Sequence, residues 1–192
     1  RRLGQPYVST YLDDTTQRTA NRLGALFMVF MVVLVLGLYR SVRTLIAFLA
    51  TLGVCLALSM GYIGLTGGSL SIVSPMVPVT IMVTVLATLV YMQSRFVDKP
   101  AGVSVDEHQL FSLSNKFVAC TASVFATAVG FAALAVSSIR PIREMGIWVA
   151  VGLSLSWVVM FTLFPALQKV LKTPTAEQRA TAAPWFAKVV DW

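Results

Sequence analysis

Long stretches without a charged side chain are the feature that most constrains the fold of this chain. Four such stretches cover residues 23–39, 44–94, 117–139 and 145–168. An ionised side chain at the centre of a bilayer costs about 2.5 to 3.5 kcal/mol on insertion scales, so charge-free runs mark membrane spans. With 57% hydrophobic and 12% charged residues, the chain has too little polar surface for a soluble domain.

The run 44–94 is too long for a single helix. It holds roughly 51 residues, whereas about 20 residues at 1.5 Å each cross a bilayer core. Glycine, serine and threonine cluster between positions 64 and 71, and Pro75 suits the first turn of a following helix. The sequence therefore predicts an all-α membrane protein, with a five-helix transmembrane bundle in residues 23–172. The expected spans are 23–39, 44–64, 72–94, 117–139 and 145–168.

Basic residues in the loops indicate the orientation of the bundle. Loops on one side hold nine Lys and Arg residues, and the alternate loops hold six. The positive-inside rule then places the amino end outside and the carboxyl end in the cytoplasm. Loop anchoring accounts for the net charge of +7, and without a basic stripe interleaved with aromatic residues we do not expect nucleic-acid binding.

Two segments outside the spans carry interfacial signals. Residues 104–107 match a capping box, which predicts a cytoplasmic amphipathic connector helix over 104–114. In this helix we expect apolar side chains such as Leu110 to rest on the membrane, and His108 and Gln109 to point to water. Residues 173–192 are expected to form a cytoplasmic interfacial tail rich in aromatic residues. Both segments either anchor the connections or sense a lipid or partner.

Groups that carry chemistry are absent from the predicted spans. No Asp, Glu, Lys, Arg or His lies within them, although proton-driven transporters usually keep such a residue in the bundle interior. His108 has only Asp106 and Glu107 near it, and Cys55 and Cys120 lie singly in apolar runs. We therefore expect no metal site, no cofactor and no catalytic residue, and the chain is not predicted to be an enzyme.

Hydroxyl side chains share one face of the third span. Thr80, Thr84 and Thr88 recur every four residues, and Tyr91 follows near the cytoplasmic end. Ser123 and Thr127 supply a similar face on the fourth span. Such a stripe either lines a polar path or packs the bundle through threonines that hydrogen-bond to their own helix.

Small residues at helical spacing predict close helix contacts. Stripes of this kind allow two helix backbones to approach in a membrane. The positions expected to pack in this way are Gly53, Ala57, Gly61, Gly130, Gly146 and Gly152.

The order of small, aromatic and proline residues along the chain matches a known pattern. Its elements are Thr127, Gly130-Phe131, Ser137-Ser138, Pro141, Gly146, Gly152 and Pro165, preceded by Tyr39-Arg40-Ser41 after the first span. In these features nearly the whole chain resembles helices two to six of one half of the resistance-nodulation-division (RND) superfamily. The likeness is greatest to its MMPL-type branch of hydrophobe and lipid exporters, and sterol-sensing domains share the same block.

This resemblance implies an architecture beyond the five spans. Residues 1–22 would end a periplasmic domain that follows a preceding helix, and a second six-helix half would complete the protein. The implied partners are the lipid bilayer, a hydrophobic or lipid substrate contacted mainly by the periplasmic domain, the second half and a periplasmic adaptor. The implied location is the bacterial inner membrane.

One departure from the family pattern affects the energy source. The family commonly carries an Asp-Tyr pair about eight residues before an Arg-aromatic pair, which Arg95-Phe96 matches here. Ala87 and Thr88 stand at the relay position, so this half lacks the usual proton-relay aspartate. The resemblance thus implies an exporter domain without its own relay. Alternatives are a sterol-sensing-like lipid-binding regulatory or scaffolding module, and a purely structural membrane subunit.

Overall fold

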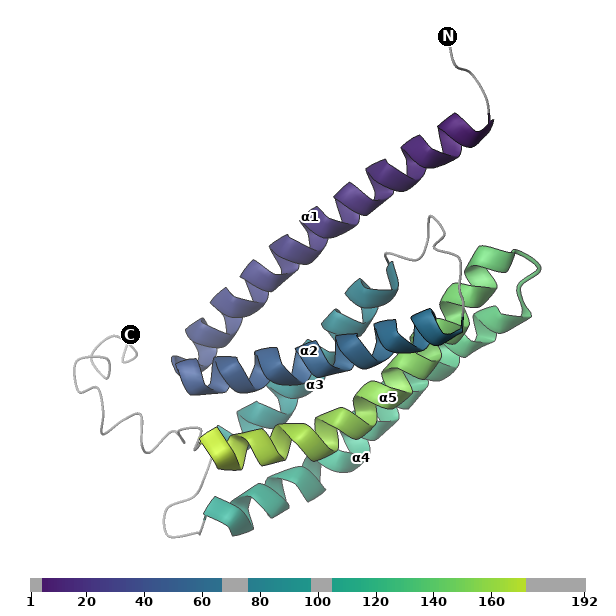
Figure 1. Ribbon diagram of the computed structural model, residues 1–192. Coiled ribbons are helices and arrows are strands. Elements are labelled where there is room, and N and C mark those ends of the chain that lie inside the picture. Colours follow the sequence, from purple (N-terminus) through teal and green to yellow (C-terminus); the bar gives the residue numbers. More distant parts are fainter. Residues whose placement is uncertain (1–4, 67–75, 98–104, 172–192) are drawn as a thin grey trace, which may run out of the picture.

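The computed structural model describes residues 5–66, 76–97 and 105–171, and in this part of the chain every regular element is helical (Figure 1). The elements are α1 (Gln5–Tyr39), α2 (Val42–Leu65), α3 (Met76–Val97), α4 (Val105–Ala132), the short 3₁₀ helix η1 (Ala133–Val136) and α5 (Arg140–Leu171). The stretches apolar and long enough to span a membrane are Arg22–Tyr39, Val42–Leu65, Met76–Val97, His108–Val136 and Arg140–Leu171. The predicted all-α five-helix membrane fold is confirmed.

Some of the predicted segments lie outside the described residues. The glycine-rich break between the second and third spans falls largely in residues 67–75, which include Pro75. The tail 173–192 and the capping residue Ser104 also lie outside them. The described part of α2 ends at Leu65, and the backbone N–H of Thr66 caps it through bonds to the carbonyls of Tyr62 and Gly64.

The connector predicted over 104–114 is not a separate surface helix. It forms the first turns of α4, which continues without interruption to Ala132. The reason is local, since no proline occurs in α4 and its first glycine is Gly130. The turn that follows also comes earlier than predicted. Ser137 accepts a bond from the N–H of Ile139 (3.2 Å), and α5 starts at Arg140 with Pro141 in its first turn.

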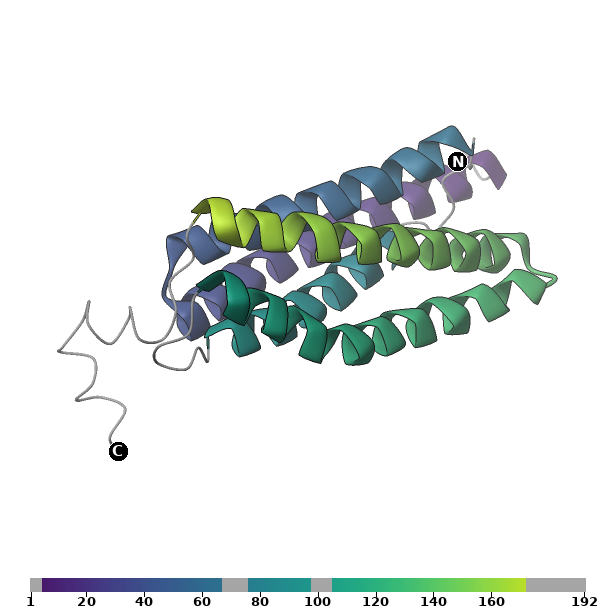
Figure 2. The same ribbon diagram turned by 90° about the horizontal axis from the view of Figure 1, so that it is seen from below.

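The two ends of the bundle are named here by their turns. The Arg40 end holds the loop between α1 and α2, the end of α3, the start of α4 and the end of α5. The Ser137 end holds the turn between α4 and α5 (Figures 1 and 2). The Arg40 loop is tight because Arg40 adopts a left-handed conformation (φ 45°) and Ser41 caps α2.

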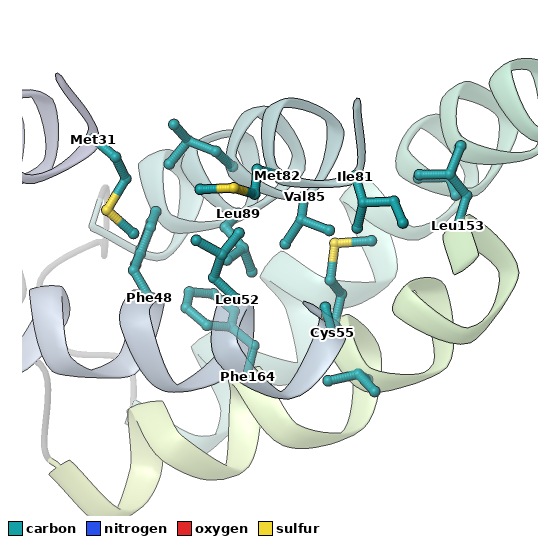
Figure 3. Close-up of a cluster of buried hydrophobic side chains, with 14 of the residues drawn as sticks. Met31, Phe48, Leu52, Cys55, Ile81, Met82, Val85, Leu89, Leu153 and Phe164 are labelled. Carbon is teal, nitrogen blue, oxygen red and sulfur yellow. The ribbon is translucent and has the colours of Figure 1, made fainter. Parts of the chain in front are cut away.

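Helix α5 packs against α2, α3 and α4, and the core lies where these helices meet (Figure 3). Phe48 of α2 meets Phe164 of α5 edge to face, with ring centroids 5.4 Å apart. Among the described side chains of α1, Met31, Val35 and Tyr39 are buried in the core, and Phe27, Met28, Val32 and Leu34 pack against it. The Tyr39 hydroxyl donates to the carbonyl of Val90 (2.9 Å) and so ties α1 to α3.

The small residues predicted to pack fall into two groups. A Cβ on Gly146 would lie 2.5 Å from the carbonyl oxygen of Phe131, and one on Gly152 would lie 2.7 Å from Cδ1 of Ile81. These two glycines therefore sit at close helix contacts.

The second group faces outward in the described chain. Gly53, Ala57, Gly61 and Gly130 are exposed, and a Cβ on any of these glycines meets nothing within 4 Å. The reason for α2 is that another row of small side chains, Ala47, Thr51, Cys55 and Ser59, is the buried face.

Candidate functional site

A groove of about 480 Å³ lies between α3 and α4. This volume is within the range of about 300 to 1,000 Å³ typical of small-molecule sites. Its lining residues, which define the α3–α4 groove, are Val83, Thr84, Ala87, Thr88, Tyr91, Ala119, Cys120, Ser123 and Thr127. Five of these nine residues carry a hydroxyl group, and the surface that the groove presents is mainly apolar.

The structure brings most of the predicted path residues together in this groove. Thr84, Tyr91, Ser123 and Thr127 line it, and so do Ala87 and Thr88 at the relay position. Thr80 does not line it. That threonine lies one turn away on α3, where its hydroxyl donates to the carbonyl of Met76 (2.9 Å). Proximity alone does not test the predicted path, so the roles of these residues stay predictions.

The threonine hydroxyls of the groove bond within their own helices. Thr84 donates to the carbonyl of Thr80, Thr88 to that of Thr84, and Thr127 to that of Ser123, each over 2.9 Å. Because their protons are used in this way, the hydroxyls offer the groove only acceptor lone pairs. No acidic side chain occurs among the described lining residues. The groove therefore presents polar acceptors but no carboxylate that exchanges a proton.

One positive charge stands beside the groove toward the Arg40 end. Tyr91 lines the groove, and the Nζ atom of Lys116 lies 3.7 Å from the centroid of its ring. An ammonium group over an aromatic face is held there by a cation–π interaction. The groove is thus asymmetric, with a cation close to Tyr91 and hydroxyl groups further along.

The two cysteines differ in their access to the groove, which gives a direct test of its presence. Both thiols are buried, but Cys120 lines the groove and keeps an exposed fraction of 3%, whereas Cys55 has none and its Sγ atom lies 4.0 Å from the carbonyl of Ser156 on α5. We expect a small, membrane-permeant thiol reagent to modify Cys120 at least about ten times faster than Cys55, since reaction needs access. Mass spectrometry of the modified peptides measures both rates. Equal protection of the two thiols would contradict an accessible groove.

A polar cluster at the Arg40 end was not predicted from the sequence. Gln168 of α5 donates through Nε2 to Oε1 of Gln93 on α3 (2.5 Å) and accepts a bond from Nε2 of Gln109 on α4 (3.2 Å). The Nε2 atom of Gln109 also donates to the carbonyl of Pro165 (2.8 Å). We call these three residues the glutamine cluster, and it links three helices.

The prediction that His108 and Gln109 point to water is wrong. Their exposed fractions are 3% and 9%, whereas those of the neighbouring Leu110 and Phe111 are 70% and 54%. The Nε2 atom of His108 lies 3.3 Å from the carbonyl of Arg95 and 3.2 Å from the hydroxyl of Ser112. Polar side chains in this part of α4 thus face the bundle, and the apolar ones face outward. One sequence feature could have predicted the glutamine cluster. Its three uncharged amide side chains, Gln93, Gln109 and Gln168, stand near the ends of three apolar spans.

Metal-binding side chains do not gather within the described ranges. No three His, Cys, Asp or Glu residues there come close enough together to hold an ion. The absence of a metal site or cofactor stays a prediction.

In the part of the chain that the structure describes, five apolar helices pack around one core with a groove between two of them, which defines an all-α membrane module. A match to a family model assigns this membrane module to a protein family. The MMPL family model matches residues 4–192, and the chain belongs to the MMPL family. The sequence resemblance to the MMPL-type branch is thereby confirmed. The searches of curated proteins and of solved structures gave no match.

Proposed function

We propose that this chain is the transmembrane domain of an RND-like transporter of the bacterial inner membrane, which exports a lipid or other hydrophobic molecule. The observation that carries the proposal is the α3–α4 groove, whose surface is mainly apolar and includes the hydroxyl groups of five of its nine lining residues. Sites for small hydrophobic ligands have this composition, because apolar contact supplies the affinity and a few polar groups orient the ligand. The amino end would lie in the periplasm and the carboxyl end in the cytoplasm.

The shape of the groove suits an alkyl chain. From Val83 to Tyr91 its α3 wall extends over roughly 12 Å at 1.5 Å per residue. The acceptor oxygens of Thr84 and Thr88 lie along this wall and can accept a bond from a hydroxyl or amide of the ligand. An amphiphile with one such donor would therefore be favoured over a plain hydrocarbon.

Energy coupling is assigned to a different part of the transporter. Ala87 has no ionisable group, and the Thr88 hydroxyl donates its proton to the carbonyl of Thr84. A proton relay would then need a carboxylate in the second half of the protein. We propose that second half, a periplasmic domain and a periplasmic adaptor as the partners of this domain.

Replacing Thr84 and Thr88 together by valine tests the groove as a path. The change keeps the side-chain shape and removes two acceptors worth about 1 kcal/mol each, so export of a hydroxyl-bearing lipophilic dye should fall about fivefold or more. The matched control is Thr162→Val, since Thr162 is exposed on α5 and makes the same bond to its own helix. Unchanged export by the double variant at normal abundance would contradict a polar path and favour a packing role.

A sterol-sensing-like module is the second candidate, and the missing carboxylate at Ala87 and Thr88 is what favours it. Such a module would bind a lipid in the same groove and regulate or scaffold a partner. The two candidates differ in transport. Lipid binding that persists while export by the intact protein is absent at every proton gradient would favour the sensing module.

A further inference from the structure

We propose that Lys116 and Tyr91 bind the anionic headgroup of a membrane lipid whose acyl chain lies in the α3–α4 groove. The inference rests on the proposed function of the groove as a site for hydrophobic ligands. The inference specifies that the ligand has a negatively charged headgroup, and that this headgroup lies at Lys116 and Tyr91.

Lys116 is an unusual residue in its helix. Among the described side chains of α4 it is the only one with a charge. It lies one turn before Cys120, so both residues are on the same face of α4, the face that lines the groove. No carboxylate of the described residues forms an ion pair with it, and its Nζ atom lies over the Tyr91 ring. Its charge is therefore available to a ligand.

The depth of Lys116 fits a lipid headgroup. About 20 helical residues cross the hydrocarbon core, and counting back that far from Val136 reaches Phe117, the residue after Lys116. Lys116 thus lies at the level where lipid phosphates begin, and Cys120, Ser123 and Thr127 lie within the hydrocarbon core. A lipid that entered the groove from the Arg40 end would place its phosphate at Lys116 and its acyl chain along these three residues.

The position of the ammonium group distinguishes this role from simple anchoring. A lysine that only anchors a helix extends its ammonium away from the hydrocarbon core into water. Here the Nζ atom lies 3.7 Å from the centroid of the Tyr91 ring, and that ring is itself part of the groove wall. The cation–π contact therefore holds the charge beside the groove.

The test compares an anionic and a zwitterionic lipid of the same acyl chains. The full-length protein is titrated with phosphatidylglycerol or phosphatidylcholine, and bound lipid is counted by native mass spectrometry. The wild type should bind phosphatidylglycerol about fivefold more tightly, as expected for one lysine near anionic lipid. Lys116→Gln should remove this preference, and Lys116→Arg should keep it. The matched control Arg43→Gln removes an exposed charge of the same end outside the groove, and it should also keep the preference.

The outcomes separate this inference from the proposed function. Equal binding of both lipids by the wild type, or a preference that survives in Lys116→Gln, would overturn the headgroup site and leave the groove as a neutral lipid site. Failure of the wild type to bind either lipid would overturn both proposals. Ala87→Leu narrows the groove without touching Lys116, so weaker binding of both lipids in this variant supports the groove as the acyl-chain site, and unchanged binding contradicts it.

Discussion

Replacing Gly146 by alanine is expected to lower the stability of the bundle by about 3 kcal/mol, at the upper end of the cost of overpacking a core. The added Cβ would lie 2.5 Å from the carbonyl oxygen of Phe131 and 2.7 Å from the Cβ of Leu134. Neither atom can move by a simple change of rotamer, since one is backbone and the other is attached to it. The end of α4 and η1 would have to shift away from α5. Thermal unfolding in detergent, followed by tryptophan fluorescence, should show a midpoint about 6 to 12 °C lower.

Gly53→Ala is the matched control for this prediction. The same methyl group is added inside a helix, but nothing lies within 4 Å of its position. Alanine is the better helix former by about 0.5 to 1 kcal/mol, so the midpoint should stay the same or rise. An unchanged midpoint for Gly146→Ala would contradict the close contact between α5 and the end of α4.

Replacing Gln168 by leucine should loosen the Arg40 end of the bundle. Gln168 is the middle member of the glutamine cluster. Its loss removes the hydrogen bond that Gln93 accepts from it and the hydrogen bond that Gln109 donates to it. Gln93 is fully buried, its Nε2 atom already lacks a partner, and it would keep no side-chain partner at all. Leaving a buried polar group unpaired costs about 1 to 3 kcal/mol. We expect a loss of about 2 kcal/mol, measured by thermal unfolding.

A second variant separates the loss of hydrogen bonds from other effects of leucine at position 168. Removing both partners of a buried bond costs less than removing one, because no polar group is left without a partner. Gln93→Leu combined with Gln168→Leu should therefore be more stable than Gln168→Leu alone. If the double variant is the less stable one, leucine disturbs packing there and the bond between Gln93 and Gln168 contributes little.

The transmembrane spans were predictable because the cost of a charge in a bilayer is large and independent of tertiary structure. The orientation of His108 and Gln109 was not. The expectation treated residues 104–114 as a surface helix with its polar side toward water. Inside a membrane bundle the pattern reverses, since apolar residues such as Leu110 face outward and polar ones pair in the interior.

The sequence predicts each of the two helix faces that line the groove, but not that they lie opposite each other. Helical spacing places Thr84 and Thr88 on one face of α3, and Ser123 and Thr127 on one face of α4. That these two faces lie opposite each other depends on tertiary packing, which spacing within a helix does not contain. The glutamine cluster was missed because the search of the spans was for ionisable groups, and amides do not titrate.

The rows of small residues on α2 also show that the sequence does not tell which face of a helix is buried. Helix α2 carries Gly53, Ala57 and Gly61 on one face and Thr51, Cys55 and Ser59 on another. Both rows have small side chains at spacings of four residues, so composition does not distinguish them. Only the second row meets α5.

The described contacts between α1 and the rest of the bundle lie near one end of this helix, so a tilt of the helix moves its other end the most. Its 35 residues extend over roughly 52 Å at 1.5 Å each. Among its described side chains the buried ones, Met31, Val35 and Tyr39, lie in the last turns next to the Arg40 loop, and Figure 1 shows the amino-terminal part of the helix diverging from the bundle. The point about which α1 would tilt is therefore at the Arg40 end. A tilt of about 5° there displaces Gln5 by about 4 to 5 Å, given that rise per residue. Any repacking around Tyr39 and Val90 that tilted α1 would therefore move the amino end of the helix much further than the Arg40 end.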